Sequence, residues 1–147
     1  MMPAPRRGFS LIELLVALTI VAILSAIAWP GYGAIVQRAH RTEAKLALLA
    51  IQHAQELHYQ RHLRYSAQLA APTAEGGLGR SAYSDSGNYL LSVRLEADGQ
   101  RHVATALADP LGRQARDRQC AYFTLDETGG RRAMDAQGND TTDACWK

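Results

Sequence analysis

The chain has 147 residues, of which 47% are hydrophobic and 20% are charged, and its formal net charge at pH 7 is +2. This length suits a single domain with its own hydrophobic core. The composition excludes a disordered tail, a collagen-like repeat and a polytopic membrane protein. The average conceals an uneven distribution: 21 of the 28 residues at positions 9–36 are apolar, and no charged residue occurs at positions 14–37.

Charge is also unevenly distributed along the chain. Arg6 and Arg7 precede the apolar segment, and the remainder holds 14 basic and 14 acidic side chains. The positive net charge therefore comes from this short leader and does not by itself indicate a nucleic-acid partner. Positions 36–64 hold five basic and two acidic residues, and positions 65–147 hold nine and eleven. The basic stretch is either a solvated face or a surface for phospholipid headgroups or an acidic neighbour.

A basic start followed by an apolar stretch is typical of a secretory signal peptide. On that interpretation the apolar core covers positions 14–24 and cleavage precedes Trp29. Glu13 argues against it, because a carboxylate within the apolar stretch costs roughly 2.5–3.5 kcal/mol on insertion scales. A simple membrane anchor is a second interpretation. The 24 uncharged residues at positions 14–37 would rise about 36 Å as a helix, and a bilayer core is about 30 Å thick.

The residues around Glu13 form a specific motif. Positions 8–16 read Gly-Phe-Ser-Leu-Ile-Glu-Leu-Leu-Val, after a short basic leader and before a long apolar run. This pattern resembles the N-terminal signature of type IV prepilins and the related pseudopilins. The resemblance implies cleavage between Gly8 and Phe9 by a prepilin peptidase, N-methylation of Phe9, and insertion of the helix in the inner membrane as a single pass. It further implies a periplasmic head and transfer, through the pilus assembly platform, into an extracellular filament.

The position of Glu13 is consistent with such a role. It lies four residues after Phe9, about one helical turn away and on nearly the same face. An unpaired carboxylate in an apolar environment is costly, so it should find a cation. The resemblance implies that this cation is the Phe9 ammonium group of a neighbouring pilin subunit, which sets the register during assembly. The alternative is a hydrated carboxylate at the membrane surface.

The apolar pattern becomes amphipathic after Gly33. One stripe recurs at steps of three to four residues: Ala44, Ala47 and Leu48, Ile51, Ala54, and Leu57 with His58. We therefore predict one helix over positions 11–62, bent near Pro30-Gly31, whose second half packs on a sheet. The expected organisation is a leader at 1–8, an apolar transmembrane and filament-core helix at 9–36, an amphipathic half-helix at 37–64 and a globular head at 65–147.

Two segments partly resemble cofactor-binding motifs, and neither has the complete motif. His58 and His62 are four residues apart, but they lack the adjacent glutamate and the third ligand of a zinc-binding helix, so we expect solvated histidines and no metal. Positions 77–81 (Gly-Leu-Gly-Arg-Ser) superficially resemble a phosphate loop. They follow a helix rather than a strand and lack the G-K-S/T ending, so we expect no nucleotide.

The remaining sequence predicts a loop followed by a sheet. Positions 70–88 are rich in Gly, Pro and Ser, which is typical of a surface loop. Alternating apolar residues predict strands at 89–95, 101–107, 119–125 and 131–135, with turns at 98–99, 109–112 and 128–130. Tyr89 and Leu91 should share one face of the first strand, and Val103 and Thr105 one face of the second. The predicted fold class is α+β, with one long N-terminal helix packed on a four-stranded antiparallel sheet.

Cys120 and Cys145 are the only cysteines of the chain. The chain would be exported whether its N-terminus is a secretory signal peptide or a prepilin leader. We therefore expect a disulfide in an oxidising periplasm. Two free thiols and intermolecular bonds are the alternatives. The layout resembles the disulfide-bounded C-terminal region of the type IV pilin fold. The Asp117-x-x-Cys120 spacing and the terminal Cys145-Trp146 are most similar to PilE-type minor pilins.

The sequence contains no G-x-S-x-G motif, no histidine–carboxylate pair beside a nucleophile and no metal-ligand set, so we do not expect an enzyme. The leading hypothesis is a structural minor subunit of a type IV pilus, for which the resemblance implies roles in pilus assembly, adhesion and twitching motility. A type II secretion pseudopilin is a further alternative. Many pseudopilins use a calcium site, and positions 135–140 offer oxygen ligands without matching an EF-hand loop.

A pilus-displayed receptor for DNA uptake is the main alternative. Five arginines lie in or near the cysteine-bounded region and could contact phosphates: Arg113, Arg116, Arg118, Arg131 and Arg132. Acidic residues interleave with them: Asp117, Asp126, Glu127 and Asp135. A solvated surface of mixed charge is therefore the competing interpretation.

Overall fold

A computed structural model describes residues 10–147, with backbone alone for residues 27–31. The chain divides into two compact units, Met1–Val36 and Gln37–Lys147. The predicted leader at 1–8 and the Gly8–Phe9 cleavage site lie outside the described residues. The Pro30 side chain, at the place where the sequence predicts a bend, is also outside them.

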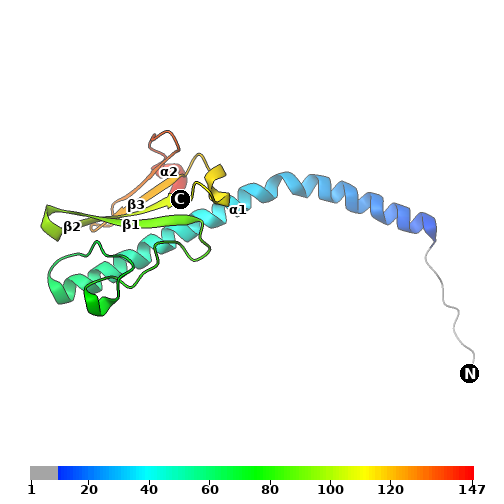
Figure 1. Ribbon diagram of the computed structural model, residues 1–147. Helices are drawn as coiled ribbons and strands as arrows, with labels where there is room; N and C mark the ends of the chain where they lie inside the picture. Colours follow the sequence, from blue (N-terminus) through cyan, green and yellow to red (C-terminus); the bar gives the residue numbers. More distant parts are fainter. Residues whose placement is uncertain (1–9) are drawn as a thin grey trace, which may run out of the picture. The chain divides into compact units, whose positions relative to one another are not determined.

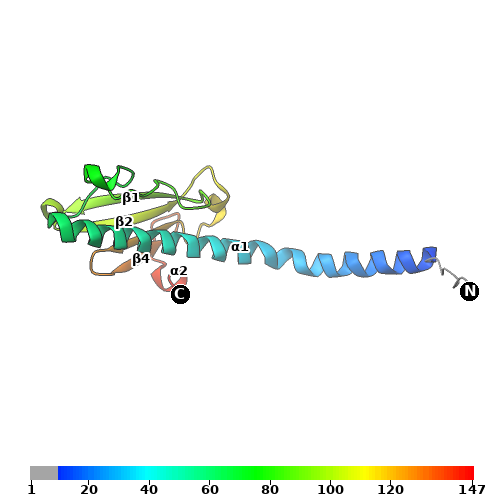
Figure 2. The ribbon, with the colours of Figure 1, turned by 90° about the horizontal axis from the view of Figure 1, so that it is seen from below.

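Helix α1 spans Leu11–His62, and its 52 residues have the predicted bounds. In the described chain it is followed by a four-stranded antiparallel sheet in the order β1-β2-β3-β4. The strands are β1 (Tyr89–Glu96), β2 (Arg101–Ala108), β3 (Tyr122–Asp126) and β4 (Arg131–Met134), and a short helix α2 (Thr142–Cys145) follows. The second half of α1 runs across one face of this sheet (Figures 1 and 2). The predicted α+β class is confirmed.

The core lies between α1 and the sheet. Ala44, Leu48 and Ile51 provide a narrow buried stripe at steps of four and three residues. The facing residues of the sheet are Tyr89, Ala104, Ala106, Phe123, Leu125 and Ala133, all 0–1% exposed. The small side chains on β2 let the helix backbone approach the sheet closely, and the large ones on β1 and β3 fill the flanks.

The predicted strand faces are present, and the structure identifies which one is buried. In β1, Tyr89 is buried while Ser92 and Arg94 are exposed. In β2 the shared face of Val103 and Thr105 is only partly covered, and the opposite face, which starts at His102, is buried. The predicted turn at Asp98-Gly99 is a short 3-10 segment, Ala97–Gly99, in which φ is positive at all three residues.

The loop between α1 and β1 is held to the helix by two polar side chains that face inward. Gln55 donates to the backbone oxygen of Ser66 at 2.7 Å and accepts from its N–H at 3.0 Å. His58 places Nδ1 2.9 Å from the Arg64 carbonyl oxygen and Nε2 3.1 Å from that of Gly76. The prediction of solvated histidines is therefore wrong for His58, because the ring is buried against the loop.

His102 occupies the buried face of β2 without a polar partner. Its side chain is 0% exposed, and neither ring nitrogen has a hydrogen-bond partner among the described residues. The ring packs edge-on against Tyr65, with centroids 4.4 Å apart. Burial lowers the pKa of His102, and the nearby carboxylates, of which Glu127 has the largest effect, oppose this shift.

We predict that His102 makes the fold sensitive to acid. Because its pKa is depressed below the ordinary 6.5, the unfolded chain binds this proton more readily than the folded chain. The stability contribution is complete above pH 6.5 and decreases as the pH falls through the lower pKa of the folded state. Thermal unfolding measured between neutral and mildly acidic pH should show a smaller loss of stability for His102→Leu than for the native chain. The control is His53→Leu on the exposed surface of α1, and equal pH dependence in both variants would contradict the prediction.

Candidate functional site

The described N-terminal part of α1 is apolar on all of its faces. Ten large hydrophobic side chains between Leu11 and Leu24 are each 52–76% exposed. Glu13 and Thr19 are the polar residues of this run, and the Thr19 hydroxyl donates to the Leu15 carbonyl oxygen at 2.7 Å. An exposed apolar surface of this extent marks an interaction site. Within the described residues, no helix satisfies both the length and the hydropathy required to cross a membrane.

Glu13 is the acidic residue in the first turn of α1, and its side chain is exposed. A carboxylate at this end of a helix interacts favourably with the helix dipole. Its proposed partner is the Phe9 ammonium group of a neighbouring subunit, and Phe9 lies outside the described residues. The structure places Glu13 in the first turn of an apolar helix.

An ion pair joins α1 to the segment that leads into the disulfide. The Arg41 guanidinium donates to both carboxylate oxygens of Asp117, at 2.6 and 2.8 Å. Asp117 also accepts from Gln114 Nε2 at 2.9 Å and from the Cys120 N–H at 3.2 Å. The two side chains are 14% and 2% exposed, respectively. The Asp117-x-x-Cys120 spacing therefore reflects one carboxylate that fixes both a helix residue and the backbone of the first cysteine.

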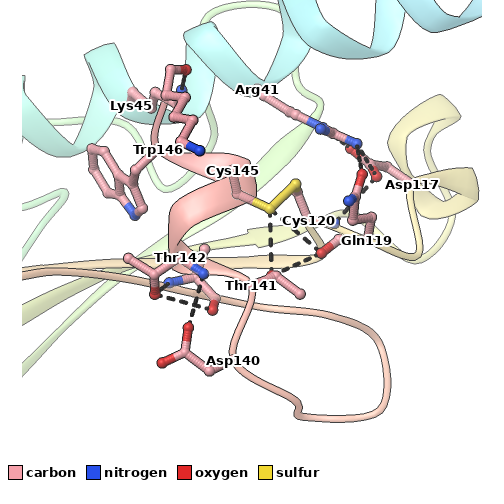
Figure 3. The surroundings of a disulfide bond; sticks show 12 residues. Arg41, Lys45, Asp117, Gln119, Cys120, Asp140, Thr141, Thr142, Cys145 and Trp146 are labelled. Carbon is pink, nitrogen blue, oxygen red and sulfur yellow. Dashed lines mark hydrogen bonds and ion pairs between the residues drawn. A yellow bond between two sulfur atoms is a disulfide. The ribbon is translucent and has the colours of Figure 1, made fainter.

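The disulfide between Cys120 and Cys145 is present, with Cα atoms 5.8 Å apart and both residues buried (Figure 3). It closes a segment of 25 residues, for which the chain-entropy estimate is roughly 3–4 kcal/mol. Further contacts hold α2 against β4. Thr142 accepts from the Ala133 N–H at 2.9 Å, and the Trp146 indole donates to the Arg132 carbonyl oxygen at 2.9 Å.

Trp146 brings cations from two elements together beside the disulfide. Lys45 Nζ lies 6.0 Å from the centre of the indole ring, and the Arg131 guanidinium carbon lies 5.3 Å from it. The ring also packs edge-on against Phe123 of the core. Burial, followed by repulsion from Arg41 and Arg131, lowers the pKa of Lys45.

The five arginines proposed for DNA contact are all exposed: Arg113, Arg116, Arg118, Arg131 and Arg132. Arg113 and Arg116 lie on the 3-10 segment Arg113–Arg116, and Arg131 and Arg132 begin β4. Within the part of the chain that the structure describes, none of the five forms a salt bridge. They are therefore distributed over the 3-10 segment, the connection to Cys120 and the start of β4.

The interleaved acidic residues have other partners. Asp117 binds Arg41, and Glu127 binds Arg101 at 2.9 Å. Partial burial raises the pKa of Asp126, but hydrogen bonds from the Thr128 hydroxyl and from the N–H groups of Thr128 and Gly130 lower it overall. Asp135 accepts from Asn139, and this hydrogen bond lowers its pKa. These carboxylates stabilise turns and neighbouring elements, which leaves the arginine charge largely uncompensated.

Sequence reasoning missed several residues that organise this site. Arg41, Gln114 and Lys45 are polar or charged residues whose partners are distant in the sequence. The separation is 76 residues for Arg41–Asp117, 74 for His40–Gln114 and 102 for Lys45–Lys147. In the sequence, the Asp117-x-x-Cys120 spacing indicates a role for Asp117. It does not indicate that Arg41 is the partner of this carboxylate.

Comparisons with known proteins give consistent similarities. Residues 30–124 match the family described as "Type IV minor pilin ComP, DNA uptake sequence receptor", and residues 4–29 match the prokaryotic N-terminal methylation motif. The type IV major pilin protein PilA of Myxococcus xanthus (strain DK1622) is 42% identical over 60 residues, which are 41% of this chain and 27% of PilA. The chain thus matches about a quarter of the length of that curated relative. A solved type IV pilin from Shewanella oneidensis has 25% sequence identity and a TM-score of 0.47, over 65% of this chain and 89% of that one.

We predict that the Arg41–Asp117 pair is a major contributor to stability. Asp117→Ala leaves a largely buried guanidinium without its carboxylate, which should cost about 3–5 kcal/mol of unfolding free energy. The matched control is Glu96→Ala, which breaks the exposed pair with Arg94 and should cost less than about 1 kcal/mol. Denaturant unfolding of the oxidised protein measures both values. Equal losses in the two variants would show that the buried pair has no special role.

Proposed function

The chain belongs to the type IV minor pilin ComP family, and on this premise we propose that it is a minor subunit of a type IV pilus, assembled through its N-terminal helix. The predicted membership of the type IV prepilins is confirmed by this family match and by the methylation motif. The proposed activity is assembly and display of the head rather than catalysis.

The apolar surface of α1 is the observation that carries the proposal. Its large side chains are exposed around the whole circumference between Leu11 and Leu24. Full burial of a side chain of this kind contributes about 1.5–3 kcal/mol, so the surface requires either lipid or other apolar helices around it. In a pilus, the helices of other pilin subunits would bury it. Before assembly, the inner membrane would do so.

The processing steps are part of the same proposal. A prepilin peptidase cleaves between Gly8 and Phe9, and Phe9 is N-methylated. The mature chain then crosses the inner membrane once, with its head in the periplasm, and the assembly platform transfers it into the extracellular pilus. Glu13 pairs with the Phe9 ammonium group of a neighbouring subunit. The matched methylation motif and the position of Glu13 in the first turn of α1 support these steps.

We predict that Glu13→Ala reduces incorporation into pili by at least about tenfold, because an unpaired ammonium group in an apolar filament would cost about 3–5 kcal/mol. Glu75→Ala, which removes an exposed carboxylate from the α1–β1 loop, is the matched control and should assemble normally. The measurement is the amount of each variant in sheared pili relative to the amount in the membrane fraction. Normal incorporation of Glu13→Ala would exclude the proposed pairing.

The second candidate is a pilus-displayed receptor for DNA. The family description names DNA uptake sequences. The specific supporting observation is that five arginines are exposed and free of salt bridges in the described chain, while the nearby carboxylates are engaged elsewhere. Guanidinium groups in this state can bind phosphate oxygens.

We predict that Arg113→Gln with Arg116→Gln weakens binding of duplex DNA and makes it less salt-dependent. Loss of two phosphate contacts should lower the slope of log K against log salt by about 1.8. The control is Arg94→Gln, because Arg94 is already paired with Glu96. Fluorescence anisotropy with the full-length chain in nonionic detergent measures the affinities. Absence of binding by the native chain, or binding without salt dependence, would exclude this candidate.

A further inference from the structure

A basic pocket lies beside the disulfide, between α1 and the end of the chain. Its volume is about 400 Å³, and its lining includes Arg38, Arg41, Lys45 and Lys147 together with Thr42 and Gln119. Among the described residues, no aspartate or glutamate side chain lines it. All of these side chains belong to the unit Gln37–Lys147. Figure 3 shows Arg41, Lys45 and Gln119 around the disulfide.

The positive charge of this pocket is only partly compensated. Asp117 neutralises Arg41 from the buried side. Lys45 donates to the main-chain oxygen of the terminal residue Lys147 at 2.9 Å, which offsets part of its charge. The guanidinium of Arg38 has no hydrogen-bond or ion-pair partner among the residues that the structure describes. Burial, followed by repulsion from Arg41 and Arg131, lowers the pKa of Lys45.

The chemistry of the pocket fits a phosphate group. Guanidinium groups bind phosphate oxygens through paired N–H donors, and an ammonium group adds a compact charge. The Gln119 amide nitrogen provides a neutral donor at the same opening, whereas the Thr42 hydroxyl already donates to the Arg38 carbonyl oxygen at 3.3 Å. A singly charged phosphodiester would offset part of the excess positive charge without adding a bulky group.

The position of these cations along α1 indicates which phosphate they meet. Arg38, Arg41 and Lys45 follow one another at steps of three and four residues, so they share one face of the helix. They directly follow the uncharged run at positions 14–37. The helix rises about 1.5 Å per residue and its side chains lean towards its N-terminus. When the uncharged run spans a bilayer, these side chains therefore reach the headgroup layer.

Cations are normally sparse on the non-cytoplasmic flank of a membrane helix. A cluster of three at that place therefore needs a specific anionic partner. We propose that the pocket binds the phosphate of an anionic phospholipid headgroup while the subunit resides in the inner membrane. This inference rests on the proposed membrane-inserted pilin. It adds a contact that holds the base of the head at the membrane until the subunit is extracted.

The test compares lipid retention by the full-length chain purified in nonionic detergent. Phosphatidylglycerol or phosphatidylcholine is added, and bound lipid is counted by native mass spectrometry. The native chain should retain phosphatidylglycerol preferentially. Each cation near an anionic headgroup contributes roughly a fivefold gain in affinity, so Arg38→Gln with Lys45→Gln should weaken phosphatidylglycerol retention about 25-fold. Retention of phosphatidylcholine should not change.

The matched control, Arg61→Gln with Arg80→Gln, removes the same charge from exposed positions outside the pocket and should retain phosphatidylglycerol normally. Equal loss in both double variants would overturn the proposal, as would equal retention of the two lipids by the native chain. Displacement of the lipid by inorganic phosphate would reassign the pocket to free phosphate. Displacement by duplex DNA would reassign it to nucleic acid, and both outcomes contradict the lipid assignment.

A separate measurement distinguishes this inference from the proposed function. Arg38→Gln with Lys45→Gln should still resist carbonate extraction from membranes, because the apolar helix is intact. Loss of lipid selectivity with retained insertion supports the pocket assignment. Carbonate extraction of the native chain would instead contradict the proposed membrane insertion.

Discussion

Much of this structure depends on how one helix is fixed to a small sheet and a polar C-terminal segment. The buried stripe of α1 is narrow, and the sheet residues opposite its centre are alanines, so dispersion and apolar burial hold the helix along a limited strip. The Arg41–Asp117 pair adds a directional constraint at one end of that strip. The same carboxylate binds the backbone of Cys120. Helix position and disulfide position are therefore coupled through a single side chain.

This coupling explains how the polar C-terminal region stays folded. The segment closed by the disulfide contributes few large apolar side chains, apart from Phe123 and Leu125 of β3. Its order comes from the crosslink, from hydrogen bonds between α2 and β4, and from Trp146 packed on Phe123. Its acidic residues form turns and ion pairs, whereas its arginines remain exposed. The result is a crosslinked segment with exposed arginines on its surface.

Much of the fold could be predicted from the sequence because its signals are local. The helical period of the apolar residues predicts the bounds of α1. Alternating apolar residues and turn dipeptides predict the bounds of β1, β2 and β4 to within one residue. For β3 the pattern predicts a start at Gln119, three residues before the observed start at Tyr122. There the Cys120 N–H binds Asp117 and the Gln119 carbonyl oxygen accepts from Thr141, so side chains replace the strand ladder. The pattern also could not indicate that the alanine face of β2 is the buried one.

The candidate site was less predictable, because its contacts join distant parts of the chain. The N-terminal motif and the cysteines were recognisable, but the Arg41–Asp117 pair and the cations around Trp146 have no local signature. Gln55 and His58 interrupt the apolar stripe with polar groups whose partners lie in the following loop. The sequence pattern shows that these polar residues interrupt an apolar helix face, but it does not indicate which residues they bind.

The central claim is that this chain is a prepilin whose working form begins at Phe9. Intact and N-terminal peptide mass spectrometry of the protein recovered from membranes tests it most directly. We expect a mature chain that starts with N-methylated Phe9 and retains the Cys120–Cys145 disulfide. A chain that starts at Met1 or at Trp29 would contradict it, because neither form would present the processed amino terminus that the proposed assembly requires.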